Sequence, residues 1–428
     1  MSLLSASASE SWLTTKSGAG SDHNQLDSNS YDYDVAIVGG GIVGTTLAAA
    51  LGGSALRVAL IEAQPTATAI AKGQAYAIHL SSKRIWQAIG VWDQIEPKLE
   101  PFRQVRLSDA CYPHVVEFAS QDLNAPALGY VAEHRHLLPE LLAFVQNCPN
   151  VDYLCPVQVG EILYGSQSAL VPLYPGNVGK DDLPVEPRQL QVQLVVAADG
   201  SRSRVRESAG IPVRGRQYGQ SCLVATIAPD RHHQNIAYER FWPSGPFAIL
   251  PANDRECRIV WTAPHREAQA LLNLDDAEFE QRLIHRYGSQ MGPLKVVSPR
   301  YIFPARIQHA TRYVQTRLAL VGDAAHTCHP VGGQGLNLGI RDAAALAQIL
   351  KNAGPQQDLG DLRVLRRYQG WRRRQNVASL QFTHLLNLTF SNEYRPVQII
   401  RRFGLRLMRW VPPVRITALK FMAGLLSF

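Results

Sequence analysis

The sequence predicts an α/β fold in which a parallel-sheet domain is interrupted by a mostly antiparallel β-sheet domain and followed by C-terminal helices. Two observations support this prediction. Apolar strands alternate with helical patterns near both ends of the chain, at 34–62 and from Leu318 onwards. Between them, short β-like runs separated by Gly and Pro dominate 211–307. The 428 residues are enough for two domains with sizeable cores.

The first predicted strand, 35–38, leads into a glycine-rich turn and a helix. The glycines have the G-x-G-x-x-G spacing and are Gly39, Gly41 and Gly44. The first allows a tight turn, the second lets a pyrophosphate approach the backbone, and the third lets the helix pack closely on the sheet. The helix begins with Ile42 and Val43, and its free N–H groups favour an anion. The unit is typical of a Rossmann-type dinucleotide site.

An acidic residue, Glu62, ends the second predicted strand, 57–61. A carboxylate at this place can accept hydrogen bonds from ribose hydroxyls. It favours an unphosphorylated ribose, and therefore FAD or NAD over NADP. Because strand, turn, helix, strand and acid occur in order, a glycine turn without a ligand is the less favoured alternative.

The following elements are predicted from hydrophobic periodicity. Amphipathic helices are expected from Ser81 and over 134–146, and residues 166–188 are expected to form a long hairpin or an insertion. The apolar run 194–198 predicts a buried strand that closes on the Asp199-Gly200 turn. Within the second domain, strands are expected at 222–227, 237–241, 247–250 and 257–262, and helix over most of 267–287. A further buried strand, 318–321, and helices at 335–351 and 362–388 follow.

Composition limits the classes of partner. Hydrophobic residues make up 46% of the chain and charged residues 18%, as in an ordinary globular protein, while the net charge is +8. No lysine- and arginine-rich block with interleaved aromatic residues stands out, so no nucleic-acid partner is expected. The six cysteines are scattered without a C-x-x-C pair, which indicates neither a metal site nor a disulfide framework. Reduced thiols favour a cytoplasmic protein.

The two ends of the chain differ in character. Residues 1–31 are rich in Ser, Ala, Thr and Gly, lack the features of a secretory signal, and are expected to be a disordered tail. No apolar run approaches the length of a transmembrane helix. After Glu393 there is no acidic residue, and basic residues alternate with apolar ones. This segment suits an interfacial helix on an anionic membrane, and a helical cap on the first domain is the alternative.

Three separated motifs give a specific resemblance: GGGIVG at 39–44, ADGSRS at 198–203 and VGDAAHTCHPVGGQGLNLGIRDAAAL at 321–346. Together they resemble the flavoprotein aromatic-ring monooxygenases of the para-hydroxybenzoate hydroxylase type. Within that group the chain is most similar to the ubiquinone-biosynthesis hydroxylase family. The closer match rests on AYERF at 237–241, SGP at 244–246, LP at 250–251 and GYV at 129–131.

The resemblance implies how the domains divide the chain. A Rossmann-type FAD-binding domain would comprise 32–102, 125–210 and 311–375, and a substrate-binding β-sheet domain would comprise 103–124 and 211–310. Residues 376–428 would form C-terminal basic amphipathic helices. The resemblance covers roughly 32–374, so the tail and the last fifty or so residues match nothing that can be named.

The predicted cofactor is FAD. Its expected contacts are Gly39, Gly41, Ile42, Val43, Gly44, Glu62, Arg135, Asp199, Gly322, Asp323, Gly333, Gly335, Leu336 and Asn337. Asp323, at a strand end, can hydrogen-bond the ribityl hydroxyls, and the glycines after it let backbone approach the flavin. A structural turn is a real competitor for Asp199, as a helix cap is for Asp323. Gln74 stands where many of these enzymes have a flavin-contacting arginine, and Lys72 and Arg135 are candidates for the lost charge, with Arg135 the better of the two.

The resemblance also implies the chemistry. Transiently bound NAD(P)H would reduce FAD, O₂ would form a flavin C4a-hydroperoxide, and an electron-rich ring would be hydroxylated. Pro330, Val331 and Gly332 would lie near the reacting flavin face, and Phe241, Pro246 and Phe247 would line the substrate pocket, with a plain core role the alternative for the last three. His326 and His329 are expected to be structural more than catalytic. No catalytic base can be named from the sequence.

The leading functional hypothesis is hydroxylation of a prenylated phenol in ubiquinone- or plastoquinone-type biosynthesis, on the inner face of a membrane. One alternative is a hydroxylase of a small soluble phenol, or an isoprenoid epoxidase or reductase. Another is a flavin-binding, membrane-attached interaction protein without oxygenase activity. A homodimer or a biosynthetic complex is compatible with each hypothesis, and the sequence decides neither the ring position nor the electron donor.

Overall fold

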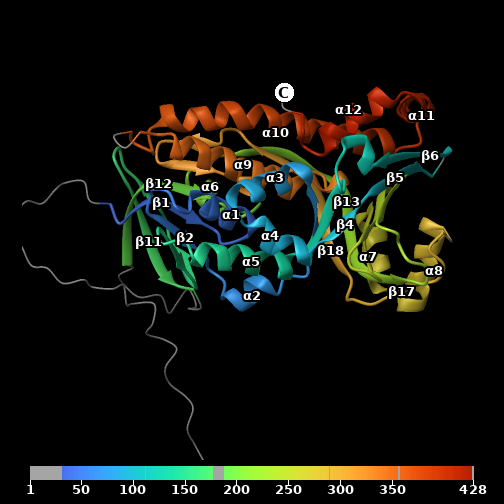
Figure 1. Cartoon of the computed structure of the whole chain (residues 1–428), viewed down its shortest axis with the longest axis horizontal. Coiled ribbons are helices and arrows are strands. Elements are labelled where there is room, and N and C mark those ends of the chain that lie inside the picture. The colour runs from blue at the N-terminus through green and yellow to red at the C-terminus, as the bar shows by residue number, and fades with distance from the viewer. Residues whose placement is uncertain (1–30, 111, 177–187, 289, 355–356, 427–428) are drawn as a thin grey trace, which may run out of the picture.

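The computed structural model describes residues 31–110, 112–176, 188–288, 290–354 and 357–426 (Figure 1). The predicted disordered tail, except for Tyr31, lies outside the described residues. So does 177–187, which is the middle of the segment predicted as a hairpin or an insertion. The described ends of that segment form β11 (Ala169–Pro175) and the start of β12 (Arg188–Ala197), which pair antiparallel.

The first sheet has nine strands and a parallel centre. Its central strands are β12, β1 (Tyr33–Val38), β2 (Val58–Ile61) and β8 (Val151–Leu154), in that order, with β20 (Leu318–Leu320) parallel to β12 on its other side. The outer strands β9 (Val157–Val159), β10 (Leu163–Tyr164), β11 and β19 (Val314–Gln315) pair antiparallel with their neighbours. Strands from both ends of the chain therefore share one sheet.

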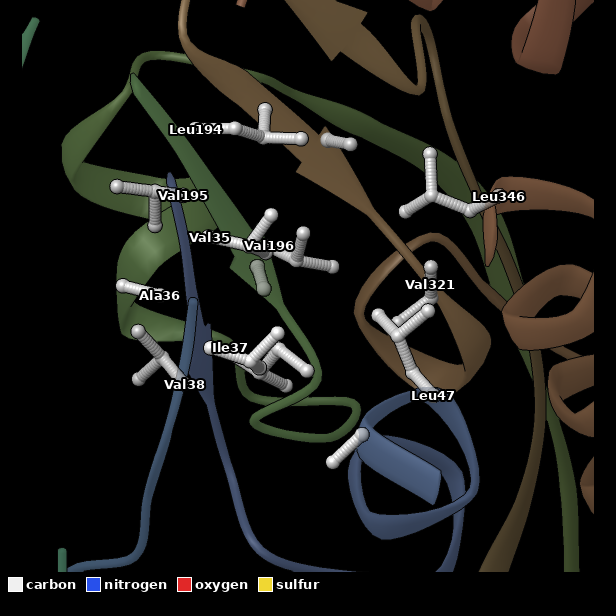
Figure 2. Close-up of a cluster of buried hydrophobic side chains, with 14 of the residues drawn as sticks. Val35, Ala36, Ile37, Val38, Leu47, Leu194, Val195, Val196, Val321 and Leu346 are labelled. Carbon is white, nitrogen blue, oxygen red and sulfur yellow. The ribbon is translucent and has the colours of Figure 1, made fainter. Parts of the chain in front are cut away.

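The parallel strands are apolar at successive positions because both faces of the sheet are covered. Figure 2 shows Ile37 and Val196 pointing toward Leu47, while Val38 and Val195 point to the opposite face. Leu47 belongs to α1 (Ile42–Leu51), which packs against α5 (His134–Gln146) and α9 (Gln334–Lys351). This core supports the two glycine-rich turns, which precede α1 and α9 at one end of the parallel strands.

The second sheet also has nine strands and is antiparallel except where β14 pairs with β5. Its strands are β5 (Gln104–Asp109), β6 (Tyr112–Ala119), β13 (Val213–Pro229), β14 (Ile236–Trp242), β15 (Gly245–Pro251), β16 (Cys257–Pro264), β17 (Leu294–Val296), β18 (Tyr301–Ala310) and β21 (His326–Thr327). One face packs on α7 (His265–Asn273) and α8 (Asp276–Tyr287). The opposite face, called the inner face below, carries Ala237, Glu239 and Phe241 and turns toward the first domain.

A third, three-stranded sheet is built from strands that lie between β2 and β8 in the sequence: β3 (Ala75–His79), β7 (Gly129–Glu133) and β4 (Glu100–Phe102). Helices α2 (Thr66–Ile70), α3 (Leu80–Ile89) and α4 (Trp92–Ile95) accompany it. β3 contacts the segment 331–333, so this sheet adjoins the third glycine-rich motif. The fold class predicted from the sequence is confirmed.

Three helices close the chain: α10 (Leu362–Phe390), α11 (Arg395–Trp410) and α12 (Pro412–Met422). α10 begins after Asp361, whose carboxylate accepts the N–H of Arg363 at 2.7 Å, and Figure 1 shows it running along the molecule. The predicted domain boundary at 375/376 falls inside this unbroken helix. No Pro or Gly interrupts 371–390, so nothing in that stretch stops the helix. Among the described residues, no helix is long and apolar enough to cross a membrane.

Candidate flavin site and substrate face

The three motifs meet at one edge of the first sheet. Gly39 has φ +112°, and a Cβ on it would lie 2.5 Å from the carbonyl oxygen of Ala198 in the second motif. A Cβ on Gly322, in the third motif, would lie 3.2 Å from the side chain of Val43 in the first. Arg206, which follows the second motif, donates to the carbonyl of Ala324 at 3.2 Å. Loops far apart in the chain thus form one cradle.

The first motif offers the space and the donors that a pyrophosphate requires. Apart from its chain neighbours, none of the described residues has an atom within 4 Å of where a Cβ of Gly41 would stand, so the backbone there is open to a ligand. α1 begins at Ile42 without a side-chain cap, which leaves its first N–H groups available.

Glu62 is buried at the end of β2, where its carboxylate accepts the N–H of Gly40 and of Gln64, each at 2.8 Å. Each oxygen keeps a further lone pair for a ribose hydroxyl.

Asp323 lies in a 3-10 turn, 322–324, that directly follows β20. Its side chain is exposed to solvent, yet the surrounding protein raises its pKa against the opposing influence of His326 and Arg306. A side chain that is both exposed and closely surrounded lies in a concave part of the surface. A ribityl chain with several hydroxyls suits a carboxylate in this position.

The third motif ends in two residues with left-handed backbone, Gly332 at φ +70° and Gly333 at φ +60°. A Cβ on Gly333 would lie 3.0 Å from the Cβ of Ala77 on β3, so a side chain there would be both strained and crowded. α9 begins directly afterwards without a side-chain cap, and Gly335 and Leu336 lie in its first turn. Their N–H groups are therefore available to a second anionic or polar group of a ligand.

The side chain of Asn337 is held within the protein, so the predicted contact of this residue with FAD would have to come from its backbone. Its amide oxygen accepts from the N–H of His79 at 2.8 Å and from the Ser82 hydroxyl at 2.7 Å. Its amide nitrogen donates to the carbonyls of Ala77 and Gly333, each at 2.7 Å. All four hydrogen-bonding positions of the amide are used, so Asn337 ties β3 to the start of α9.

A buried ionic network supports the Asp323 turn and was not foreseen from the sequence. Asp342 accepts from His326 at 2.6 Å, from the guanidinium of Arg372 at 2.8 Å, from Asn376 at 2.9 Å and from the N–H of Gly322 at 3.2 Å. Burial alone would raise the pKa of Asp342, but the facing His326 and Arg372 outweigh it and hold the pKa well below its ordinary range. His326 is thereby a structural partner of the turn.

Two other predicted contacts are engaged with protein. Asp199 accepts the N–H of Val205 at 3.2 Å, while its second oxygen is buried without a partner among the described residues. Arg135 is 60% exposed and pairs with Glu133 at 2.7 Å. Near the Lys72 loop an unforeseen cation is present, since the Arg258 guanidinium of β16 donates to the carbonyl of Gly73.

On the substrate side, Phe241 and Val331 belong to one buried cluster, whereas Phe247 does not. Phe241 pairs with Pro246 across β14 and β15, so these two side chains share the inner face. Phe247 follows Pro246 directly and therefore points to the other face, where it packs on Trp261. The structure thus removes Phe247 from the predicted substrate pocket.

The dinucleotide cradle, its carboxylates at the strand ends and the two helix N-termini define an FAD-dependent monooxygenase. The chain belongs to the family described as FAD binding domain, whose model matches residues 32–383.

The comparisons with known proteins give full-length relatives. The chain is 44% identical to the uncharacterized protein slr1300 of Synechocystis sp., over 92% of this chain and 94% of the relative. It is 36% identical to the ubiquinone hydroxylase UbiL of Rhodospirillum rubrum, over 92% and 90%. It is 32% identical to the 3-demethoxyubiquinol 3-hydroxylase of Escherichia coli, over 92% and 98%.

A solved structure agrees with the fold. The p-nitrophenol 4-monooxygenase PnpA of Pseudomonas putida aligns with a TM-score of 0.73 at 20% identity, covering 91% of this chain and 98% of that one. The predicted family, the enzyme class and FAD as cofactor are confirmed.

Proposed function

We propose that this protein is a hydroxylase of a prenylated phenol in ubiquinone- or plastoquinone-type quinone biosynthesis. The observation that carries the proposal is the apposition of the Val331 loop of the flavin cradle to the apolar inner face of the second sheet. Two relatives of similar length, UbiL and the Escherichia coli enzyme, are named for hydroxylation of ubiquinone or a ubiquinol precursor.

In this proposal, different residues of the chain bind different parts of FAD and of the substrate. The glycine turns and the N-termini of α1 and α9 bind the pyrophosphate and the flavin edge, Glu62 binds the ribose, and Asp323 binds the ribityl chain. When bound, FAD supplies the activation of O₂ and the transfer of one oxygen atom. The inner face excludes water from the ring while Pro330, Val331 and Gly332 hold it against the flavin. NAD(P)H serves as a transient reductant.

Substrate access from a membrane is proposed from the surface of α11. Ile399, Phe403 and Trp410 are 67%, 66% and 71% exposed and recur at helical spacing, so they form one apolar stripe. Exposed Arg406 lies between Phe403 and Trp410 on the same side of the helix, and exposed Arg409 lies beside the stripe. A stripe of this kind with a basic border suits the headgroup region of an anionic membrane.

The other side of α11 is fixed to the protein. Arg401 is buried and pairs with Asp109 at the end of β5 at 2.5 Å, so the apolar stripe cannot simply turn inward. α12 then leads from α11 back to the cradle, where the carbonyl of Met422 accepts from Gln334 at 3.1 Å. The proposed membrane surface and the loop beside the reacting ring are thus joined by one short helix.

The test is turnover with a defined probe. Purified, FAD-loaded protein is mixed with NADPH and 2-(3-methylbut-2-enyl)phenol in detergent micelles, and products are identified by mass spectrometry. We expect NADPH consumption that the phenol stimulates and a product one oxygen heavier. If the product forms equally well from phenol without the prenyl chain, the soluble-phenol alternative is favoured. Unstimulated NADPH oxidation without a hydroxylated product would contradict the proposal.

A further inference from the structure

Glu239 lies in the middle of the inner face. It alternates with Ala237 and Phe241 along β14, and its cross-strand neighbours are Leu107 on β5 and Ala248 on β15. All four of these neighbours are apolar. A carboxylate therefore lies in the centre of an otherwise apolar surface. The alternation of side chains along β14 keeps it on this inner face.

The inner face around Glu239 adjoins the flavin cradle. Ala237 and Phe241, which flank it, belong to the same cluster as Val331 of the third motif. Ala77 of β3 packs on this cluster and also touches the position of a Cβ on Gly333. The Glu239 carboxylate thus emerges between the sheet and the loop at which the aromatic substrate is proposed to bind.

Two other charged residues on this face have partners. Asp109 is paired with Arg401 of α11, and Arg258 donates to the Thr226 hydroxyl and to the Gly73 carbonyl. For Glu239 the described residues supply no hydrogen bond and no ion pair, although its side chain is only partly exposed. An unpaired carboxylate in an apolar surrounding is costly, and such a cost is commonly kept at sites that act on a ligand.

We propose that Glu239 is a catalytic residue that binds the phenolic hydroxyl of the substrate and accepts its proton. This inference rests on the proposed function. The O–H bond breaks, the proton moves to the carboxylate, and the bonding pair stays on the phenolic oxygen. The phenolate is a stronger nucleophile at its ring carbons than the neutral phenol, so it captures the oxygen atom that the flavin and O₂ supply.

The cycle then closes without a net change in Glu239. As the ring carbon bonds to the incoming oxygen, the phenolate pair forms a C=O bond. Loss of the ring proton to solvent restores the aromatic ring, and Glu239 returns its proton to the phenolic oxygen. The substrate gains one oxygen atom, and the electrons that reduce the second oxygen atom to water come from NAD(P)H.

The proton affinity of the site agrees with this role. Burial raises the pKa of Glu239 to about 7 from an ordinary value of 4.5. An acid or base works best when its pKa lies near the operating pH. The Cys222 thiol on β13, which interacts electrostatically with Glu239, does not compete for the proton, because burial raises its pKa to about 12. Asp109, Arg401 and Arg258 are held in the contacts named above.

The test compares wild type with Glu239→Gln, Glu239→Asp and a control, Glu117→Gln, whose glutamate is 52% exposed on β6 and paired with Arg106. The probe is 2-(3-methylbut-2-enyl)phenol, with product measured between pH 5.5 and 9. For wild type we expect kcat/KM to fall below about pH 7. For Glu239→Gln we expect a loss of about 10²- to 10⁴-fold and no acid limb. For Glu239→Asp, kcat/KM should still fall at acidic pH but from a lower maximum, and the control should match wild type.

The outcomes separate this inference from the proposed function. If wild type forms no hydroxylated product, the proposed function fails before any variant is compared. If wild type is active and Glu239→Gln has the same rate and the same pH profile, Glu239 carries no proton and the inference is overturned. Bound FAD per chain is measured for each variant, so that a loss of cofactor is not read as a loss of catalysis.

A stability measurement checks the unpaired charge independently of turnover. Because the folded-state pKa of Glu239 lies above its unfolded value, the folded protein binds more protons than the unfolded chain between about pH 4.5 and 7, and stability falls as the pH rises through that window. Glu239→Gln should therefore melt at a higher temperature than wild type at pH 8 and at nearly the same temperature at pH 5. A variant less stable than wild type at pH 8 would mean that the carboxylate has a stabilising partner.

Discussion

Asp323 is the carboxylate that we expect to bind the ribityl chain of FAD, and Asp342 and its partners fix the turn on which it stands. The acidity of Asp323 is reduced by the protein around it, so a ligand that donates hydrogen bonds would replace lost hydration. Asp323 is the third residue after β20, and it is both acidic and exposed to solvent.

Replacing Asp323 by Ala should release flavin. Loss of a hydrogen bond to a charged group is worth about 1.5–3 kcal/mol, or roughly 10- to 100-fold in affinity for FAD. Fluorescence titration of the apoprotein with FAD measures the change. Asp93→Ala on α4, which removes an exposed aspartate elsewhere, is the control and should bind FAD normally. A variant that purifies with one FAD per chain would show that Asp323 has been misplaced.

Asp342 is a different kind of residue, since it acts on the cofactor only through the turn it supports. Asp342→Asn would leave Arg372 buried without its counter-charge, at a cost of about 3–5 kcal/mol in the free energy of unfolding. Urea denaturation at pH 7 measures this. Asp276, which is 68% exposed and pairs with Arg300, provides the control, and Asp276→Asn should cost less than about 1 kcal/mol.

The pH dependence of Asp342 has a definite sign. Its folded-state pKa is depressed, so its contribution is complete above the unfolded-state value near pH 4 and is lost as the pH falls below it. The difference in stability between wild type and Asp342→Asn should therefore shrink on acidification below about pH 4. A difference that stays constant down to pH 3 would contradict the ionised state of Asp342.

At the residue scale, residues whose role depends on the local backbone were easier to predict from the sequence than side chains that pair with one another across the fold. The glycines and Asp323 follow strands at recognisable spacings, so their places were predictable. Asp342 was not, because an aspartate inside an amphipathic helix looks like part of a solvated face. Its partners Arg372 and Asn376 come from a helix whose position the sequence does not encode locally.

At the scale of elements, periodicity located α5 and α9 within one residue at each end, because each has a clear apolar stripe and a sharp beginning. The prediction of the substrate pocket failed at one point, because two adjacent residues of a strand were both assigned to the pocket. Pro246 and Phe247 cannot share a face of a strand, and only the pairing of β15 with β14 and β16 decides which of them faces inward. The predicted C-terminal boundary lies inside α10, because the composition changes there while the helix continues.

The apolar stripe of α11 makes a prediction about this element alone. Ile399→Ser combined with Phe403→Ser and Trp410→Ser should weaken sedimentation with vesicles of phosphatidylcholine and phosphatidylglycerol by about tenfold or more, since each side chain loses roughly 1.5–3 kcal/mol of burial. Binding of wild type should also weaken as salt is raised. Leu163→Ser, at an exposed leucine of the first sheet, is the control. Equal sedimentation of wild type and triple variant would exclude this stripe as the membrane contact.

On the scale of the whole molecule, α10 joins the two large sheets. The first half of α10 packs on the FAD-binding domain. There Tyr368 donates to the carbonyl of Leu320 at 2.8 Å, and Arg372 forms an ion pair with Asp342. Its last residue, Phe390, stacks on Phe241 of the second sheet with ring centroids 4.0 Å apart. The substrate is proposed to bind between the domains, so their relative position must be held by contacts outside the pocket.

Phe390→Ala should therefore uncouple the unfolding of the two domains. Wild type with FAD is expected to melt in one transition, and flavin release should coincide with the loss of helical signal. Removal of the buried ring costs about 3–5 kcal/mol at the second sheet. The variant should show an earlier transition of the β-sheet domain, with flavin still bound until the later one. Leu385→Ala, at an exposed leucine on the same helix, should keep the single transition. If Phe390→Ala also melts in one step, the coupling runs through other bonds between the domains, such as those of Arg258 with Gly73 and of Arg306 with Ser201.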